Sequence, residues 1–225
     1  MKYTSLFLDL DDTLLDFHKA EAVAIRQVLK KHGLPYDDET VKKYSEINLS
    51  YWKRFEKGEI KREEIFENRF VTLLDYLNRE GDVKAIAEDY FFYLSEGYFT
   101  VDGATEILQY LKSRGYKLYI TTNGVSVTQF KRIHNSGIED LVDGIFVSED
   151  TGHKKPEKEY FDYIFERIPE KDKDKILIIG DSQSSDILGG INSGIDTCWY
   201  NPKGETARYQ SRYVIKQISD LHDIL

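Results

Sequence analysis

The stretch that decides the fold is Asp9-Leu10-Asp11-Asp12-Thr13, near the start of the chain. It follows an apolar run, Tyr3 to Leu8, whose aromatic and aliphatic residues are typical of a buried strand. Residues two apart on a strand point the same way, so Asp9 and Asp11 are expected to face one spot beyond the strand's end. Two carboxylates placed together repel unless a cation lies between them. The pattern indicates a metal site or a carboxylate nucleophile beside an acid/base, with a simple turn as the structural alternative.

The composition is that of an ordinary globular protein. The 225 residues are 40% hydrophobic and 32% charged, with a formal net charge of -9. This charge argues against polymeric nucleic acid or an anionic membrane surface as the main partner, and no apolar run approaches the roughly 20 residues that span a bilayer. Cys198 is the only cysteine, which excludes an intrachain disulfide and a cysteine-based zinc cluster. With no signal-peptide pattern before Asp9, a cytoplasmic location is expected; the oligomeric state is not indicated.

The second half of the chain alternates short apolar runs with amphipathic stretches. The pattern predicts strands at 117–121, 144–148, 176–179 and 197–200, helices at 104–114, 125–136, 157–168 and 184–193, and a final edge strand at 213–215 with a helix over 217–224. Alternating strands and helices predict right-handed βαβ units and a parallel sheet covered on both faces. The nearly all-apolar strands agree, because such a strand has no side in water. The predicted fold class is therefore α/β, with a doubly wound parallel sheet.

The segment from Asp16 to Phe99 has a different character. It contains no convincing strand, and its apolar residues recur at helical spacing, with helices expected near 18–32, 39–57, 61–79 and 83–98. An all-helical block inserted just after the first strand is expected to lie over that strand's C-terminal end, where open α/β sheets bind ligands. We therefore expect two domains, a core of 1–15 and 100–225 and a helical lid, or cap, over 16–99.

Three further polar segments fall at the ends of the predicted strands: Thr121-Thr122-Asn123-Gly124, Lys154-Lys155-Pro156, and Gly180-Asp181-Ser182 with Asp186 five residues after Asp181. The first offers a hydroxyl, a glycine that lets the backbone approach an anion, and the N-terminus of the next helix. The second supplies a cation, and the third supplies two more carboxylates. Each segment alone is a weak signal, because such loops are commonly rich in these residue types. Their combination at the ends of successive strands indicates one site.

With the opening motif, these segments resemble the four motifs of the haloacid dehalogenase superfamily, whose members are mostly phosphatases with a Rossmann-like core. The resemblance spans nearly the whole chain, and the helical insert is similar to that superfamily's type of cap between the first two motifs. The chain also resembles one branch of the superfamily, the bacterial pyrimidine 5'-nucleotidases. The resemblance lies in Trp52 with Glu56 to Ile60, and in Ser185 to Gly194 with Thr197 to Trp199. A departure is Val101-Asp102-Gly103, where relatives usually have a Pro before the Gly.

The resemblance implies a phosphomonoester hydrolase that works through an aspartyl-phosphate and acts on nucleoside monophosphates, small phosphorylated substrates. Asp9 would attack phosphorus, and Asp11 would protonate the leaving ribose oxygen and then activate water. Thr122 and the backbone near Asn123 would hold phosphoryl oxygens. Lys155 would offset charge on Asp9 and on the phosphate.

The carboxylates also predict a metal ion. Asp9, Asp11, Asp181 and Asp186 carry more negative charge than one lysine balances, so a hard divalent cation, Mg²⁺, is expected. By resemblance its ligands are the carboxylates of Asp9 and Asp181 and the main-chain carbonyl of Asp11. Asp186 would reach the metal through water or would instead orient Lys155, and both readings stay open.

The cap is the part of the chain that would choose the substrate. It carries much of the aromatic content, and most of these residues are expected in its core. The candidates for facing the substrate are Phe17, His18, Tyr51 and Trp52. A sugar-phosphate phosphatase or phosphomutase is the main alternative, because it would share the core chemistry and differ in the cap. A non-catalytic phosphate-binding regulatory module is a further alternative, although such drift usually loses a motif and none is lost here.

Overall fold

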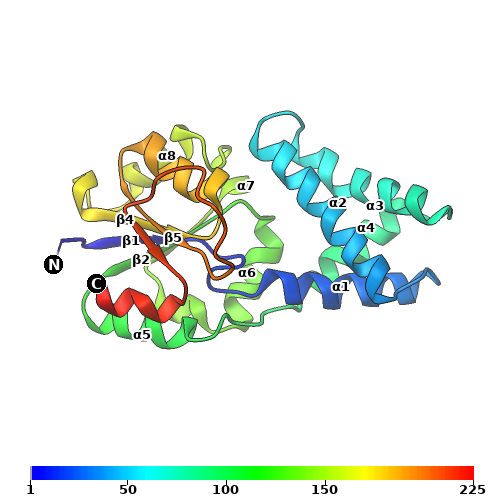
Figure 1. Ribbon diagram of the computed structural model, residues 1–225, viewed down its shortest axis with the longest axis horizontal. Coiled ribbons are helices and arrows are strands. Elements are labelled where there is room, and N and C mark those ends of the chain that lie inside the picture. The colour runs from blue at the N-terminus through cyan, green and yellow to red at the C-terminus, as the bar shows by residue number, and fades with distance from the viewer. Residues whose placement is uncertain (1) are drawn as a thin grey trace. The chain divides into compact units, whose positions relative to one another are not determined.

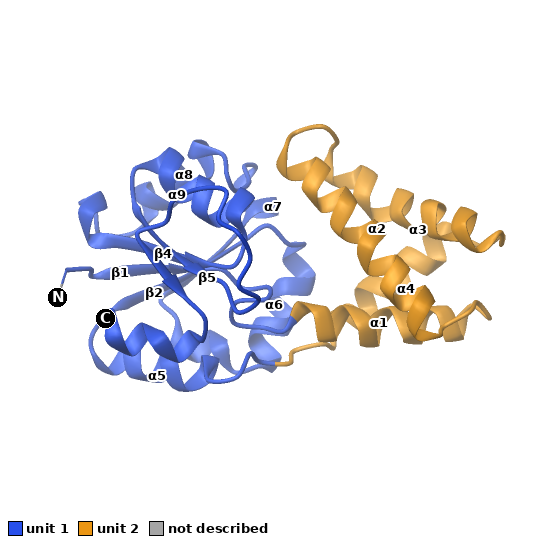
Figure 2. Cartoon of the chain, in the orientation of Figure 1, with its two compact units in different colours: residues 1–16, 100–225 blue, residues 17–99 orange. Residues whose placement is uncertain are grey.

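The computed structural model describes residues 2–225, so Met1, the first residue of the expected core, lies outside that range. The chain divides into two compact units (Figure 2). The sheet unit consists of the chain up to Asp16 together with Thr100–Leu225, and the helical unit consists of Phe17–Phe99. In residues 2–225 no helix combines the length and apolar character that crossing a membrane requires.

The sheet unit is built on a six-stranded sheet in the described part of the chain, and each neighbouring pair of strands is parallel (Figure 1). The strands are β1 (Ser5–Leu8), β2 (Lys117–Thr122), β3 (Gly144–Val147), β4 (Ile176–Gly180), β5 (Asp196–Tyr200) and β6 (Tyr213–Ile215). Their order is β3-β2-β1-β4-β5-β6, so the sheet grows outward in both directions from β1 and β4. This order is that of the Rossmann-like doubly wound fold, and it confirms the predicted fold class.

The central strand β1 is buried along its whole length. Leu8 pairs with Ile120 of β2 on one side and with Ile179 of β4 on the other. Successive side chains point to opposite faces of the sheet, where Leu6 and Leu8 join one apolar cluster and Phe7 joins another. Because both faces are covered, no position of the strand lies in water, and this explains why all of its residues except the small buried Ser5 are apolar.

The helices of the sheet unit largely follow the predicted ranges. They are α5 (Ala104–Ser113), α6 (Ser126–Asn135), α7 (Ser148–Thr151), α8 (Lys158–Arg167) and α9 (Leu188–Ser193), with short 3₁₀ turns η1 (Ile138–Leu141), η2 (Lys173–Lys175) and η4 (Ile218–Asp223). The helix predicted over 184–193 begins instead as the π-helical turn η3 (Gln183–Ile187), in which the amide of Ile187 donates to the carbonyl of Ser182 at 3.2 Å. Such wide turns are rare and often occur at functional sites.

The helical unit has an apolar core of its own. Its helices are α1 (Phe17–Lys31), α2 (Asp38–Glu56), α3 (Arg62–Leu77) and α4 (Val83–Ser95). Helices α2 and α4 begin at aspartate caps, where Asp37 accepts from the amide of Thr40 and Asp82 accepts from that of Ala85. Three of the aromatic residues are fully buried at the centre, Tyr44, Phe70 and Tyr90.

The chain leaves the sheet unit and returns to it at adjacent points. Leu15 and Thr100 form an isolated antiparallel bridge, and the amide of Val101 donates to the carbonyl of Leu14 at 3.0 Å. The two connections to the helical unit are therefore tied together by backbone hydrogen bonds within the sheet unit.

Candidate active site

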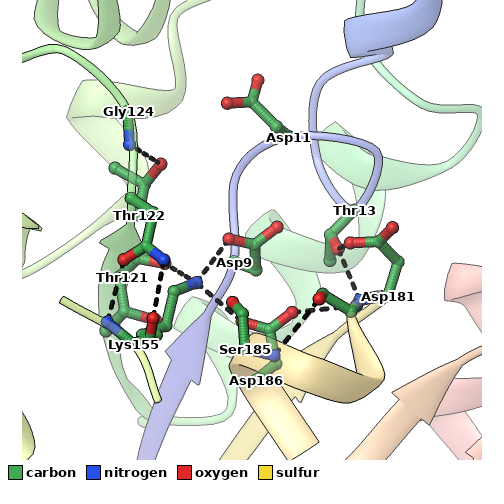
Figure 3. Close-up of polar contacts among 12 residues, drawn as sticks. Asp9, Asp11, Thr13, Thr121, Thr122, Gly124, Lys155, Asp181, Ser185 and Asp186 are labelled. Carbon is green, nitrogen blue, oxygen red and sulfur yellow. Dashed lines mark hydrogen bonds and ion pairs between the residues drawn. The ribbon is translucent and has the colours of Figure 1, made fainter. Parts of the chain in front are cut away.

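Three carboxylates meet at the C-terminal edge of the central strands. Asp9 directly follows β1 and Asp181 directly follows β4, the adjacent strands between which the strand order reverses. Ligands of open α/β sheets bind at this switch point. Asp186 comes from the π-helical turn η3, and one oxygen of each of the three carboxylates lies within 4.8 Å of the others (Figure 3).

Lys155 is the cation of this group. Its ammonium donates to Asp9 Oδ1, to Asp186 Oδ1 and to the carbonyl of Thr121, each at 2.6 Å, and the residue is 1% exposed. Burial alone would lower the pKa of Lys155, but the charges of Asp186 and Asp9 outweigh burial and raise the pKa above its ordinary value. The ammonium therefore stays charged and orients two carboxylates at once.

The charge of the group favours a divalent cation. Burial raises the pKa of Asp9 to about 8, with Lys155 opposing the rise and Asp186 adding to it. Burial and then the charge of Asp9 raise the pKa of Asp181 well above its usual range. When all three are ionised, the carboxylates and the one ammonium leave an excess of two negative charges, which burial disfavours unless another cation binds. Their oxygens are the hard ligands that Mg²⁺ prefers, so the residues fit such an ion.

Without a divalent cation, the fold is expected to lose stability as the pH rises. The pKa of Asp9 is about 8 in the folded protein against an ordinary 3.8, so between these values the folded state binds more protons than the unfolded state. Raising the pH across this window therefore favours unfolding, by about 1.4 kcal/mol for each pH unit crossed. Urea denaturation in EDTA at pH 5 and pH 8 measures the loss. Adding Mg²⁺ should reduce it, and a pH-independent stability in EDTA would contradict this reading.

Asp11 is turned to a different set of partners. Its Oδ1 accepts from Arg132 Nη1 at 2.5 Å and its Oδ2 accepts from Gln129 Nε2 at 2.7 Å, and its carboxylate points away from Asp9 (Figure 3). Asp9 and Asp11 are therefore held by different partners, and their action on one reacting group stays a prediction. Strand alternation does not apply to them, because β1 ends at Leu8 and the chain turns through Asp12, whose φ is 57°.

The end of β2 and the segment after it contact Lys155 and each other. Thr122 ends β2, and its hydroxyl oxygen accepts from the amide of Gly124 at 3.3 Å. The carboxamide of Asn123 is bonded to the backbone of Lys155 in both directions, at 2.9 Å each, with Nδ2 donating to the carbonyl and Oδ1 accepting from the amide. The side chain of Asn123 therefore positions Lys155, and the binding of a phosphoryl oxygen by its backbone stays a prediction.

Asp186 and Asp181 are held by their own contacts. Asp186 accepts at Oδ1 from Lys155 Nζ and at Oδ2 from the amide of Ser182 at 3.0 Å. A Cβ at residue 180 would lie 2.2 Å from that Oδ2, so only Gly180 lets Asp186 reach the strand end. The backbone of Asp181 donates from its amide to Thr13 Oγ1 at 3.2 Å and accepts at its carbonyl from Trp199 Nε1 at 2.8 Å.

Of the four substrate candidates in the helical unit, three pack within it and one is exposed. Tyr51 Oη bonds Thr72 Oγ1 at 2.9 Å, and the ring of Trp52 meets that of Phe55 edge-on with centroids 5.8 Å apart. Phe17 packs against the apolar core of the unit, and His18 is exposed. A role for these four residues in substrate binding stays a prediction.

Gln129, Arg132 and Trp199 also contact the site, and the four motifs do not point to them. A signal for the first two lies in the sequence nevertheless. Gln129 and Arg132 are three residues apart on a helix that directly follows the Thr122 motif, and this spacing places them on one face. Trp199 carries no comparable signal, because an aromatic residue in a strand is usually core.

Comparison with known proteins identifies the family. The family of haloacid dehalogenase-like hydrolases matches residues 3–194, and the chain belongs to it. The protein is therefore a hydrolase of the family that its four motifs indicated.

Among individual relatives, the haloacid dehalogenase-like hydrolase YfnB of Bacillus subtilis is 42% identical, over 100% of this chain and 96% of that protein. A crystal structure of YfnB bound to magnesium superposes with a TM-score of 0.95, covering 100% of this chain and 99% of the other. The pyrimidine 5'-nucleotidase PynA of Streptococcus pneumoniae is 37% identical over 100% of this chain and 96% of that protein. A glyceraldehyde 3-phosphate phosphatase of Pyrococcus abyssi is 33% identical over 87% of this chain and 80% of that protein.

Proposed function

We propose that the protein is a Mg²⁺-dependent phosphomonoester hydrolase that works through an aspartyl-phosphate. The observation that carries this proposal is the bonding of Lys155 to Asp9 and Asp186 at the switch point of the sheet, beside Asp181. A carboxylate nucleophile needs a fixed orientation and a neighbouring cation to approach an anionic phosphate. Lys155 supplies both.

The steps follow from the chain's own residues. Asp9 attacks phosphorus, the bond to the leaving oxygen breaks, and Asp11 gives that oxygen a proton. Asp11 then takes a proton from the water that hydrolyses the aspartyl-phosphate, releasing inorganic phosphate and regenerating Asp9. Thr122 and the backbone of Asn123 hold phosphoryl oxygens, and Lys155 offsets their charge.

The carboxylates of Asp9 and Asp181 and the main-chain carbonyl of Asp11 would hold Mg²⁺. When bound, the ion neutralises charge on the phosphoryl oxygens. We assign Asp186 to orienting Lys155, because its two oxygens already accept from Lys155 Nζ and from the amide of Ser182.

For the substrate, we propose (deoxy)pyrimidine nucleoside monophosphates, hydrolysed in the cytoplasm. PynA supports this, because its similarity covers the whole of this chain and so includes residues 16–99. Phe17, His18, Tyr51 and Trp52 are the candidates for contacting the nucleoside. A sugar-phosphate phosphatase is the second candidate, supported by the relative from Pyrococcus abyssi.

Phosphate release from dUMP, dTMP, glyceraldehyde 3-phosphate and ribose 5-phosphate, with Mg²⁺ and with EDTA, tests the proposal. We expect kcat/KM to be at least about tenfold higher for the pyrimidine nucleotides, a difference of about 1.4 kcal/mol in transition-state binding. EDTA should abolish release. A preference for glyceraldehyde 3-phosphate would favour the second candidate, and no release from any of the four would overturn the proposed activity.

A further inference from the structure

Two long polar side chains, those of Gln129 and Arg132, lie on the buried face of α6. Gln129 is 2% exposed and Arg132 is 0% exposed. Burying a guanidinium costs several kcal/mol unless its charge is paired and its hydrogen bonds are made. Neither residue belongs to the four motifs, so their burial calls for an explanation from their partners.

Those partners are two residues of the proposed chemistry. Arg132 Nη1 donates to Asp11 Oδ1 at 2.5 Å and to Gln129 Oε1 at 2.9 Å. Gln129 Nε2 donates to Asp11 Oδ2 at 2.7 Å and to Thr122 Oγ1 at 2.9 Å. Both oxygens of Asp11 are therefore bonded to α6, and one carboxamide joins Asp11 to Thr122.

These bonds also set the direction of the Thr122 hydroxyl. A hydroxyl has one proton to donate and two lone pairs that accept. Thr122 Oγ1 accepts from Gln129 and from the amide of Gly124, which occupies both lone pairs. Its proton is then available to an anionic oxygen. A Cβ at residue 124 would lie 2.4 Å from Gln129 Nε2, so Gly124 makes the space in which this carboxamide sits.

We propose that Gln129 and Arg132 are positioning residues of the phosphoryl-transfer site. Both fix the carboxylate of Asp11, and Gln129 also makes the hydroxyl of Thr122 a donor toward the phosphoryl group. This inference rests on the proposed function. The two residues have separable effects, because Arg132 acts on the proton-transferring carboxylate and Gln129 acts on the phosphate ligand as well.

Arg132 is tested with p-nitrophenyl phosphate, whose leaving group departs without needing a proton. Forming the aspartyl-phosphate then depends little on Asp11, whereas hydrolysing it still does. We expect Arg132→Met to lower kcat by about 10²-fold and to lower KM, while a rapid-quench burst of p-nitrophenol stays near one equivalent per site. Arg132→Lys should recover part of the rate. Arg114→Met, at an exposed position after α5, is the matched control.

Gln129 is tested by binding of inorganic phosphate in the presence of Mg²⁺, which needs no turnover. We expect Gln129→Leu to weaken binding about tenfold, the loss of roughly one hydrogen bond to a charged group, and Arg132→Met to leave binding within about twofold. Gln109→Leu, at an exposed position of α5, is the matched control. Should Arg132→Met fail to fold by circular dichroism, Arg132→Lys and Gln129→Leu carry the comparison.

Wild-type turnover, burst and phosphate binding in the Gln129 and Arg132 variants would overturn the positioning role. A p-nitrophenol burst that decreases in proportion to kcat would also overturn the positioning role of Arg132, because it would mean that fewer sites are folded and active. A wild-type protein that hydrolyses no phosphomonoester would remove the proposed function, and the positioning role with it. These failures are distinguishable, since the last one is seen before any variant is compared.

Discussion

Replacing Asp9 with asparagine is expected to abolish phosphate release, lowering kcat by about 10⁴-fold or more. An amide is not a nucleophile for phosphorus, and the substitution also removes one carboxylate from the group that would hold Mg²⁺. The fold should survive, because the asparagine amide carries no charge at a position where burial raises the pKa of the Asp9 carboxyl to about 8. Phosphate release and urea denaturation, measured on the same preparation, check both parts.

The matched control for this variant is Asp12→Asn. Asp12 lies in the same motif, but its backbone is left-handed, with φ of 57°, and asparagine tolerates that conformation. We expect this variant to keep most of its activity. Equal losses in the two variants would mean that general disruption of the loop, rather than removal of the nucleophile, explains the first result. An Asp9→Asn enzyme with wild-type turnover would overturn the aspartyl-phosphate mechanism.

Replacing Lys155 with methionine is expected to have the largest effect on stability. Its ammonium is the shared partner of Asp9 and Asp186, and all three groups are buried. Removing one partner of a buried ion pair leaves an uncompensated charge, which costs about 3–5 kcal/mol. The loss should be greater at pH 8 than at pH 5, because low pH lets the carboxyls take up protons instead. Urea denaturation in EDTA at the two pH values measures it.

Lys154→Met separates this effect from a general loss of positive charge. Lys154 is the neighbouring residue, and its ammonium bonds Glu157 Oε1 at 2.5 Å, in a partly exposed pair. Such pairs contribute about 0–1 kcal/mol, so this control should remain close to the wild type. A Lys155→Met protein as stable as the Lys154→Met protein would show that the buried carboxylates do not depend on the ammonium.

The fold could be predicted from the sequence because its signals are local. β4 is a continuous apolar run and β1 is apolar after Ser5, and runs of that kind with helical stretches on both sides have few packing solutions other than a covered parallel sheet. The helices of Phe17–Phe99 were similarly marked by apolar spacing. The ends of elements were less accurate: the first predicted strand included Tyr3, whereas β1 begins at Ser5. Tyr3 lies before the strand, and its hydroxyl donates to Asp196 Oδ2 at 2.7 Å.

The candidate site could be predicted only as far as its motifs extend. The sequence does not reveal that Asn123 bonds the backbone of Lys155, because the two are 32 positions apart. It does not reveal the turn of Asp11 toward α6, which depends on a helix 118 positions later in the chain. The question left open for Asp186 also required coordinates, since the π-helical turn decides which atoms its oxygens meet. Contacts of this range are fixed by the packed structure and not by local pattern.

The bridge between Leu15 and Thr100 has a consequence for how the protein can evolve. An inserted segment whose two ends are hydrogen-bonded to each other can be lengthened, shortened or exchanged with little change in the cost of closing it. The residues proposed for phosphoryl transfer are all encoded outside 17–99. One contiguous stretch of the gene can therefore be replaced by recombination while the codons of the residues proposed for phosphoryl transfer stay unchanged. Relatives can in this way diverge in substrate and still share one reaction.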